Sequence, residues 1–552
     1  MAADSERDVV VVGAGIAGLT AAALLAREGA GVLLLEAHQQ SGGCAGTFRR
    51  GPWTFDVGAT QVAGLEANGI HARLFARLGL EPPPATPLDP GCVVHLGDGS
   101  EPVWIHRDPQ AWCRERLTRF PGSGRFWSLC DAIHRANWAF AARDPVLPPR
   151  SLWDLRQLLS ALGPGNLASG LLTTASVADL LRLSGCAGGA SGARLRRFLD
   201  LQLRLYSQEP ADRTAALYGA TVLAMVQQPL GLWHLEGSMQ ALASSLEQAL
   251  ARDGGELRRR HCLERLEPPA RSGDPWVLAG TGPGGGRFRL QARDVVLTLP
   301  PQTLPTLLGD GLPSGYRRRL AALPEPSGAL VLYGAVERRH LPADGVGHHQ
   351  LAWEEPGSLF ISVSHEGDGR APLGQATVIA SVFTPARPWF EAGEAEFQAR
   401  KARAGEGIEA GLEALLGIGA SQWLHRELAT PRAWARWTGR PFGYVGGLGQ
   451  HPSRFGPFGL ASRTPLRGLW LCGDAIHPGE GTAGVSLSAF MACRQLLAAR
   501  GQELTLPPKG PEPPLPRSPR SPAAAAAAAS GPAGGGGSPG GSPTRTRRGD
   551  HR

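Results

Sequence analysis

The chain has 552 residues, 42% of them hydrophobic and 19% charged, which is enough for two or more globular domains with a large core. The formal net charge is +8, but the segment beyond Leu506 supplies +5 of it, with seven basic and two acidic side chains. The rest of the chain is nearly neutral, so the composition gives no reason to expect a nucleic-acid partner.

Composition also sets expectations for the ends of the chain and for its compartment. Residues 503–552 are rich in Pro, Ala, Gly and Arg, which predicts a disordered tail, either a solvated end or a weak attachment to anionic lipid. The most apolar stretch, residues 9–26, is interrupted by glycines, and the first eight residues lack the pattern of a signal peptide. We therefore expect no membrane span and a location on the cytoplasmic side. Eight cysteines without paired spacing indicate neither a metal site nor a disulfide framework.

The first motif lies near the start of the chain. Residues 9–12 predict a buried parallel strand and residues 16–28 a helix, and the turn between them reads Gly13-Ala14-Gly15-Ile16-Ala17-Gly18. These glycines permit a tight turn, close approach of a pyrophosphate and close packing of helix on strand, while the helix N-terminus favours an anion.

A second predicted strand, residues 32–35, ends at Glu36-Ala37, roughly 20 residues past the glycines, where a carboxylate accepts hydrogen bonds from a ribose diol. The alternative is a glycine-rich turn that binds nothing. We favour a dinucleotide site, because the strand, the helix, the second strand and the acid follow one another in the order and spacing of such a site.

The residues just beyond carry a resemblance. Ser41-Gly42-Gly43-Cys44 is followed by Phe55-Asp56-Val57-Gly58. This resembles the double-glycine and FDxG stretches of the flavoprotein superfamily that contains amine oxidases, protoporphyrinogen oxidase and phytoene-desaturase-type enzymes. The resemblance implies that the cofactor is FAD and that Gly42, Gly43, Asp56 and Gly58 belong to its site. The superfamily usually has Arg where this chain has Cys44.

The middle of the chain continues the resemblance. Gly237 precedes a predicted helix that runs to Asp253-Gly-Gly, and a short strand then ends near residue 266. In the superfamily this arrangement returns the chain to the FAD domain, which implies that Leu263 lies against the adenine. Residues 294–301 resemble the buried strand that crosses over to the substrate domain.

The second glycine motif closes the folded part. Residues 469–471 predict a buried strand, Gly473-Asp474 a turn, and Gly484-Val485 the start of a last helix. Asp474 is the candidate for the ribityl or pyrophosphate region, because a carboxylate at a turn accepts from several donors. By resemblance, the amides of Gly484 and Val485 face the N1/C2=O edge of the flavin. His477 is a weak catalytic candidate, a packed or surface histidine being favoured; no other catalytic residue is predicted.

The lysine content separates branches of the superfamily. Flavin amine oxidases commonly use a lysine near flavin N5, whereas this chain has only Lys401, in a polar helical stretch, and Lys509, in the tail. The closing motif, Gly-Asp-x-x-His-Pro-Gly-x-Gly-x-x-Gly-Val, resembles the signature of carotenoid desaturases and isomerases. With residues 120–127 and 437–447 it looks most like the cyanobacterial carotenoid 3′,4′-desaturase group, and the resemblance covers roughly residues 8–500.

The resemblance implies an α/β fold in two domains. A Rossmann-type FAD-binding domain is assembled from the discontinuous segments 1–90, 226–300 and 440–502. A mixed α+β substrate domain consists of residues 91–225 and 301–439, in which we expect Trp- and Leu-rich helical stretches, such as 151–159 and 178–183, to cover the flavin.

The predicted function is that of a carotenoid desaturase, in which hydride transfer from an allylic C–H of a polyene to FAD is followed by proton loss. The expected partners are the carotenoid, a membrane surface that the protein binds peripherally, and quinone or oxygen as electron acceptor. Three alternatives stay open: a carotenoid cis-trans isomerase using reduced FAD, an amine oxidase-like enzyme, and a non-catalytic lipid escort like the Rab GDP-dissociation inhibitors. The retained glycines, Glu36, Asp56 and Asp474 argue against the escort.

Overall fold

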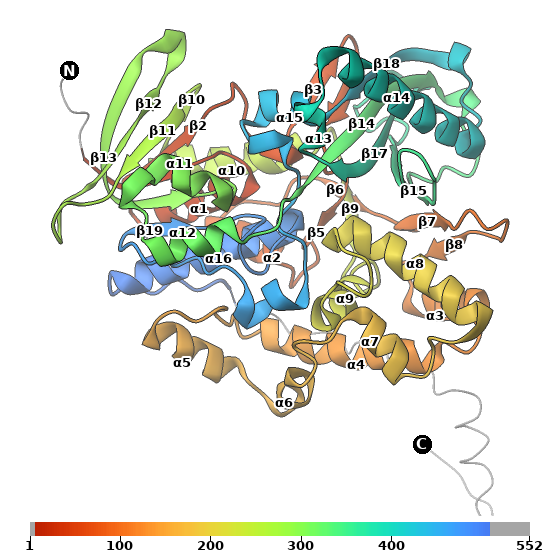
Figure 1. Cartoon of the computed structure of the whole chain (residues 1–552), viewed down its shortest axis with the longest axis horizontal. Helices are drawn as coiled ribbons and strands as arrows, with labels where there is room; N and C mark the ends of the chain where they lie inside the picture. The colour runs from red at the N-terminus through yellow and green to blue at the C-terminus, as the bar shows by residue number, and fades with distance from the viewer. Residues whose placement is uncertain (1–5, 508–552) are drawn as a thin grey trace, which may run out of the picture. The chain divides into compact units, whose positions relative to one another are not determined.

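A mostly parallel sheet carries the first glycine motif (Figure 1). The computed structural model describes residues 6–507, and the predicted tail from residue 508 onward lies outside them. Parallel pairing joins β10 (Glu256–Arg259), β2 (Val32–Glu36), β1 (Arg7–Val12) and β13 (Arg287–Leu297) in that order. Two antiparallel strands, β12 (Trp276–Thr281) and β11 (Cys262–Glu267), extend the sheet beyond β13, and β19 (Leu469–Leu471) pairs in parallel with the end of β13.

Strand β1 is buried on both faces because successive side chains of a strand point in opposite directions. Val9 and Val11 pack in one core with helices α1 (Ile16–Arg27), α10 (Gln240–Arg252) and α16 (Gly481–Ala499). Val10 and Val12 pack in a second core, which includes α11 (Leu304–Leu308). The uninterrupted valine run of the sequence is thus explained by helices and strands on both sides.

The end of the described chain is also packed. Leu504 and Leu506 are only 2% and 5% exposed and belong to the core around α1 and α16. Ordered packing therefore continues past residue 503, where we predicted the tail to begin.

A second, mainly antiparallel sheet lies in the parts predicted to bind substrate. Its order is β18 (Trp423–Ala429), β14 (Ser327–Glu337), β17 (Gln375–Pro385), β16 (Leu359–Val363), β15 (His348–Leu351), β7 (Cys92–His95) and β8 (Val103–Ile105), with β7 and β15 parallel. Helix α14 (Glu394–Leu416) packs on it. We had expected helical stretches here, but β14 and β17 are apolar runs of eleven residues rich in β-branched and small side chains, which suit strands.

Helices dominate residues 109–222 and surround a further core. They are α3 (Pro109–Arg119), α4 (Gly124–Ala141), α5 (Leu152–Ala161), α6 (Pro164–Gly170), α7 (Val177–Leu183), α8 (Gly189–Ser207) and α9 (Ala216–Val222). The remaining helices are α2 (Ile70–Leu78), α12 (Ser314–Ala321), α13 (Pro388–Glu391) and α15 (Pro431–Thr438). The smaller sheets are β3 (Thr47–Arg50) with β4 (Trp53–Asp56), and β5 (Val62–Ala63) with β9 (Leu232–Leu235) and β6 (Ala85–Pro87).

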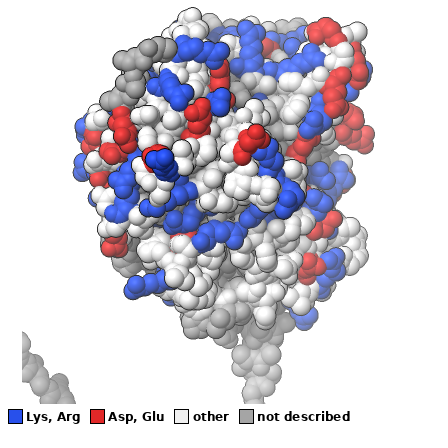
Figure 2. All heavy atoms as spheres, turned by 60° about the vertical axis from the view of Figure 1, so that its left-hand side comes forward, with Lys and Arg blue, Asp and Glu red and all other residues white. Residues whose placement is uncertain are grey.

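The fold is mixed α/β with parallel and antiparallel sheets, which confirms the predicted class. Every strand of the first sheet lies in the segments predicted to bind FAD, and every strand of the second in those predicted to bind substrate; the domain boundaries themselves stay a prediction. On the face drawn in Figure 2, acidic and basic side chains are interspersed. Among the described helices, none combines the length and apolar character needed to cross a bilayer.

Candidate active site

A cavity of about 1620 Å³ is lined by residues of both large sheets. Its volume exceeds the roughly 300–1,000 Å³ of ordinary ligand pockets, so it has room for a dinucleotide and a long substrate together. Of the residues predicted to bind the cofactor, those that line it are Gly13, Gly15, Ile16, Ala17, Glu36, Gly42, Gly43, Gly58, Gly473, Asp474, Gly484 and Val485.

The first glycine turn is tight and leaves open space beside the start of α1. Gly13 has a φ of +97°, and a Cβ on Gly18 would lie 1.8 Å from the carbonyl oxygen of Gly13, so these two glycines serve the turn and the packing of α1. A Cβ on Gly15 would meet no atom closer than 4.0 Å, the Cα of Gly43. The protein itself leaves room for a side chain at Gly15, and the missing side chain leaves the cavity open beside the start of α1.

Glu36 ends β2 at the wall of the cavity. One carboxylate oxygen accepts from the backbone N–H of Ala14 (2.6 Å) and the other from that of His38 (2.8 Å), so the acid ties the two strand ends together. Burial nevertheless raises its pKa. The lone pairs that these amides leave free are available to a ribose diol.

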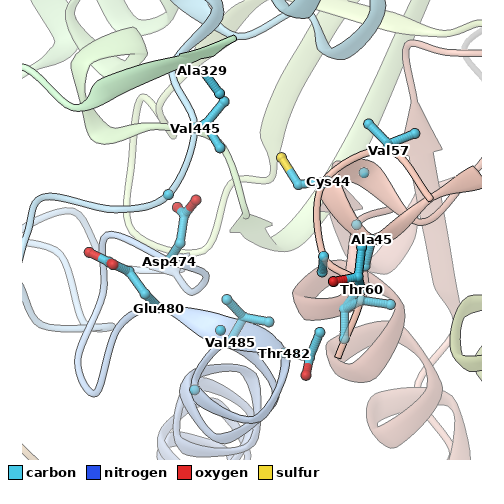
Figure 3. A pocket seen from close by; sticks show the side chains of 18 of the residues that line it. Cys44, Ala45, Val57, Thr60, Ala329, Val445, Asp474, Glu480, Thr482 and Val485 are labelled. Atoms are coloured by element: carbon cyan, nitrogen blue, oxygen red, sulfur yellow. The ribbon is translucent and has the colours of Figure 1, made fainter. Parts of the chain in front are cut away.

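The second glycine motif closes the cavity from the opposite side (Figure 3). Figure 3 shows Thr482 and Val485, in the first turns of α16, facing the space between Asp474 and Glu480 on one side and Cys44 and Thr60 on the other. Helix α16 begins at Gly481, so its positive dipole end faces the cavity, an arrangement that stabilises negative charge. Segments more than 400 residues apart in the sequence thus line one cavity.

Arg440 is a lining residue that the sequence analysis missed. Its Nη2 donates to Asp474 Oδ2 (2.8 Å) and to the carbonyl oxygen of Gly446 (2.9 Å). The nearby Asp474 carboxylate raises the pKa of Arg440, and burial raises that of the Cys44 thiol beside it, so the arginine is charged and the thiol neutral. A guanidinium therefore stands next to the position where the superfamily usually has Arg. Arg440 follows Trp437-Thr-Gly in a segment that carries the family resemblance. That resemblance indicated the segment but not the role of this residue.

Glu480 is a second missed lining residue. It accepts from the backbone N–H of Gly449 (3.1 Å), and desolvation raises its pKa to about 8. The carboxyl is therefore mostly protonated at neutral pH.

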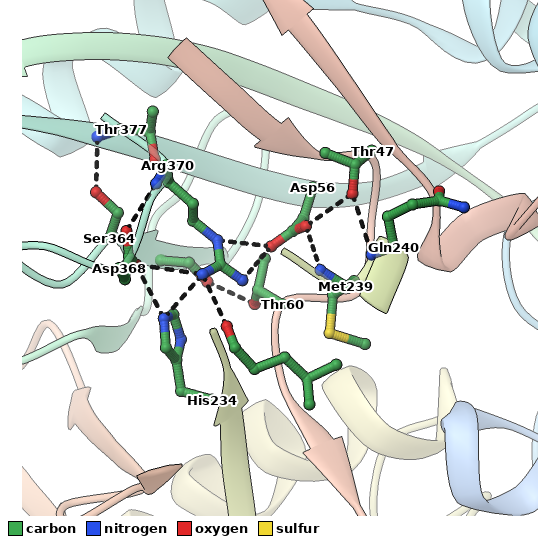
Figure 4. A network of polar contacts seen from close by, with 12 residues as sticks. Thr47, Asp56, Thr60, His234, Met239, Gln240, Ser364, Asp368, Arg370 and Thr377 are labelled. Carbon is green, nitrogen blue, oxygen red and sulfur yellow. Dashed lines mark hydrogen bonds and ion pairs between the residues drawn. The ribbon is translucent and has the colours of Figure 1, made fainter. Parts of the chain in front are cut away.

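Asp56 lies outside the cavity lining, in a buried network (Figure 4). Its carboxylate accepts from the N–H of Met239 (2.8 Å) and from Nε and Nη2 of Arg370 (3.1 and 2.9 Å). Arg370 also pairs with Asp368, which bonds His234 (2.9 Å). The network joins β4, the start of α10 and the loop before β17, so Asp56 holds the cavity walls together. Its predicted contact with the cofactor stays a prediction.

The other predicted residues outside the lining have protein partners as well. Ala14 and Ala37 hold Glu36 through their backbone N–H groups, Gly18 packs against Gly13, and Leu263 is buried beside β2. His477 packs against the ring of Phe455 at 5.5 Å, and burial lowers its pKa to about 4. The imidazole is therefore neutral at neutral pH and lies outside the described lining, and the catalytic role of His477 stays a prediction.

A further part of the cavity wall is mainly apolar and comes from the second sheet and the helices beside it. Strands β14 and β17, helix α9 and helix α15 contribute Ala329, Val331, Tyr333, Phe383, Val222 and Trp434. None of the described residues that line the cavity is a lysine. Such a wall suits an apolar substrate.

Known proteins resemble the chain over nearly its whole described length. The chloroplastic prolycopene isomerase of Arabidopsis thaliana is 25% identical over 91% of this chain and 84% of its own. The zeta-carotene-forming phytoene desaturase of Myxococcus xanthus is 25% identical over 91% of this chain and 96% of its own. These names agree with the desaturase and isomerase type predicted from the closing motif.

Solved structures share the fold. Putrescine oxidase, solved with bound putrescine, superposes with a TM-score of 0.59 at 19% identity, over 90% of this chain and all of its own. An oxidoreductase from Methanosarcina mazei gives 0.56 at 14% identity, over 87% and 98%. The sequence model of the flavin containing amine oxidoreductase family matches residues 16–497. The chain therefore belongs to this family and is an FAD-dependent oxidoreductase.

Proposed function

We propose that the protein is a carotenoid desaturase that introduces the C-3′,4′ double bond. FAD, when bound, supplies the acceptor for a hydride from an allylic C–H of the polyene. The chain's own residues bind the cofactor at the glycine turns, align the polyene along the apolar walls and exclude water. A proton is lost from the carbon next to the oxidised one, which completes the new double bond.

The observation that carries this proposal is the composition of the cavity. One part of its wall consists of glycine turns and helix N-termini, and another of aliphatic and aromatic side chains from β14, β17, α9 and α15. A long hydrocarbon that reaches from the apolar end to the cofactor would fill both parts. The two carotenoid-modifying relatives support the same substrate class.

A carotenoid cis-trans isomerase is the second candidate. Prolycopene isomerases match this chain at the same 25% identity as the phytoene desaturase. An isomerase would use the same cavity without net oxidation of the polyene.

An amine oxidase is less well supported, because Lys401 lies on α14 and no lysine is found among the described lining residues. A lipid escort without cofactor is opposed by the open space at Gly15 and the groups beside it. We also propose peripheral attachment on the cytoplasmic side of a membrane, with quinone or oxygen as the electron acceptor.

Pigment analysis of a carotenoid-producing host with and without the chain tests substrate and reaction together. A desaturase produces a carotenoid with one more double bond and two fewer hydrogens. An isomer of unchanged mass would favour the second candidate, and an unchanged pigment profile with a carotenoid-rich host would contradict both.

A further inference from the structure

Helix α5 exposes its leucines to solvent. Leu152 is 87% exposed and Leu159 57%, while Leu155 and the following Leu162 are each 41% exposed. At 100° per residue these four side chains fall on one stripe of the helix. Leu171, just after α6, is also 86% exposed. A helix on the surface of a soluble protein ordinarily turns its apolar stripe inward, so this orientation is reversed.

Polar contacts hold the opposite face of α5 against the protein. Asp154 is fully buried and pairs with Arg463 at 3.4 Å. Arg494 of α16 donates to the side chain of Gln157 (3.0 Å) and lies over the ring of Trp153. Arg143 donates to the carbonyl oxygen of Ala161 (3.0 Å). These contacts anchor the helix along its length, so its leucine stripe faces the solvent.

The charges beside the stripe are basic. Arg150 and Arg156 are exposed, and Arg156 lies next to the leucines on the helix. Both acidic side chains among residues 143–162 form ion pairs, Asp144 with Arg73 (2.9 Å) and Asp154 with Arg463. An apolar stripe with exposed arginines beside it is the pattern of a helix that lies in the interface of an anionic bilayer.

The cavity reaches the segment that leads into α5. Trp138 and Ala141, at the end of α4, line it, as does Asp144. Arg494 donates both to the carbonyl oxygen of Asp144 and to Gln157 of α5, so one side chain joins the cavity wall to the exposed helix.

We propose that the leucine stripe of α5 (Leu152, Leu155, Leu159 and Leu162) is the surface that docks on an anionic lipid bilayer and brings the α4 end of the cavity to the membrane. The use of this surface for an apolar substrate rests on the proposed function. Docking itself does not, because it depends only on the stripe and its arginines.

Flotation of the full-length holoprotein with vesicles of phosphatidylcholine, with and without phosphatidylglycerol, tests the proposal. Leu152→Ser/Leu159→Ser should lower the vesicle partition coefficient at least about tenfold. The matched control is Leu373→Ser/Leu424→Ser, which alters leucines of 82% and 41% exposure elsewhere and should change it by less than about twofold. Arg150→Glu/Arg156→Glu should weaken binding to the anionic vesicles more than to the neutral ones.

Equal vesicle binding by the α5 double variant and the wild type would overturn the proposal. So would a wild-type dimer, seen in sedimentation velocity, that the variant converts to monomers without any change in vesicle binding. The second result would assign the stripe to another copy of the chain. Flavin absorbance and melting temperature show that each variant is folded. The vesicles contain no polyene, so this result is independent of the pigment analysis.

Discussion

The part of the cavity wall predicted to bind FAD (the cofactor end) and the apolar part predicted to bind substrate (the substrate end) differ in composition. At the cofactor end, glycine-rich turns within residues 13–17, 42–46 and 473–485 form much of the wall, together with the side chains of Glu36, Arg440 and Glu480. At the substrate end, the wall consists of side chains from strands and helices that lie far apart in the sequence. A wall of backbone has one shape, whereas a wall of side chains changes with each substitution. We therefore expect substitutions at the first end to abolish cofactor binding and those at the second to alter substrate selection.

The largest expected effect concerns Arg370, which holds the two ends together. Its side chain is 3% exposed and pairs with Asp56 and Asp368, which are 2% and 5% exposed. Arg370→Gln leaves the buried Asp56 carboxylate without its cationic partner and Asp368 with His234 alone, and should lower the free energy of unfolding by about 3–5 kcal/mol in urea denaturation of the holoprotein. Arg400→Gln, in an exposed pair with Glu396, should cost less than about 1 kcal/mol. Similar losses in the two variants would contradict the bridging role.

The next effect tests the cofactor end alone. Gly15→Ala adds a methyl group that meets no protein atom within 4 Å except the Cα of Gly43 at 4.0 Å, so the fold should be kept. If the space belongs to the cofactor, FAD should bind about 100-fold more weakly, roughly 2.7 kcal/mol, in fluorescence titration of the apoprotein. The control is Gly315→Ala on α12, where the added methyl also meets nothing. Unchanged FAD affinity in Gly15→Ala would place the cofactor elsewhere.

The substrate end should respond in the opposite way. Ala329 lies on β14 beside Val445 in the cavity wall (Figure 3). Ala329→Phe adds bulk to the apolar wall and should raise KM for a carotenoid about tenfold, roughly 1.4 kcal/mol of lost binding. FAD affinity should stay the same within about twofold in the same titration. A parallel loss of FAD affinity would show that the two ends are not separate.

The smallest effect is a pH dependence of stability from Glu480. Its folded-state pKa of about 8 lies above the unfolded value of 4.5, so the folded protein binds more protons between these values and stability falls as pH rises through that window. Glu480→Gln removes this penalty. The stability gain of the variant over wild type should grow by on the order of 1 kcal/mol between pH 5 and pH 8 in denaturant titrations. A gain that does not vary with pH would mean that Glu480 titrates normally.

The difference between the two parts of the cavity wall also determines which of its residues can be predicted from the sequence. The glycine turn, β1, β2 and the start of α16 follow from local patterns, because each function there is carried by neighbouring residues. The walls of the substrate end do not, since Val331 and Ser381 lie opposite each other in the cavity wall only through the pairing of β14 with β17. Arg440 and Arg370 were missed for a similar reason: their partners Asp474 and Asp56 lie 34 and 314 residues away. Long-range ion pairs leave no periodic signal in one sequence.

The central claim is that this FAD-dependent enzyme oxidises a polyene in the cavity. Anaerobic incubation of the oxidised holoprotein with a carotenoid tests it most directly, with flavin absorbance and product mass measured on the same sample. We predict one reduced flavin for each new double bond. A geometric isomer formed without a change in flavin absorbance would contradict desaturation, and flavin reduced by amines but by no carotenoid would contradict the substrate class as well.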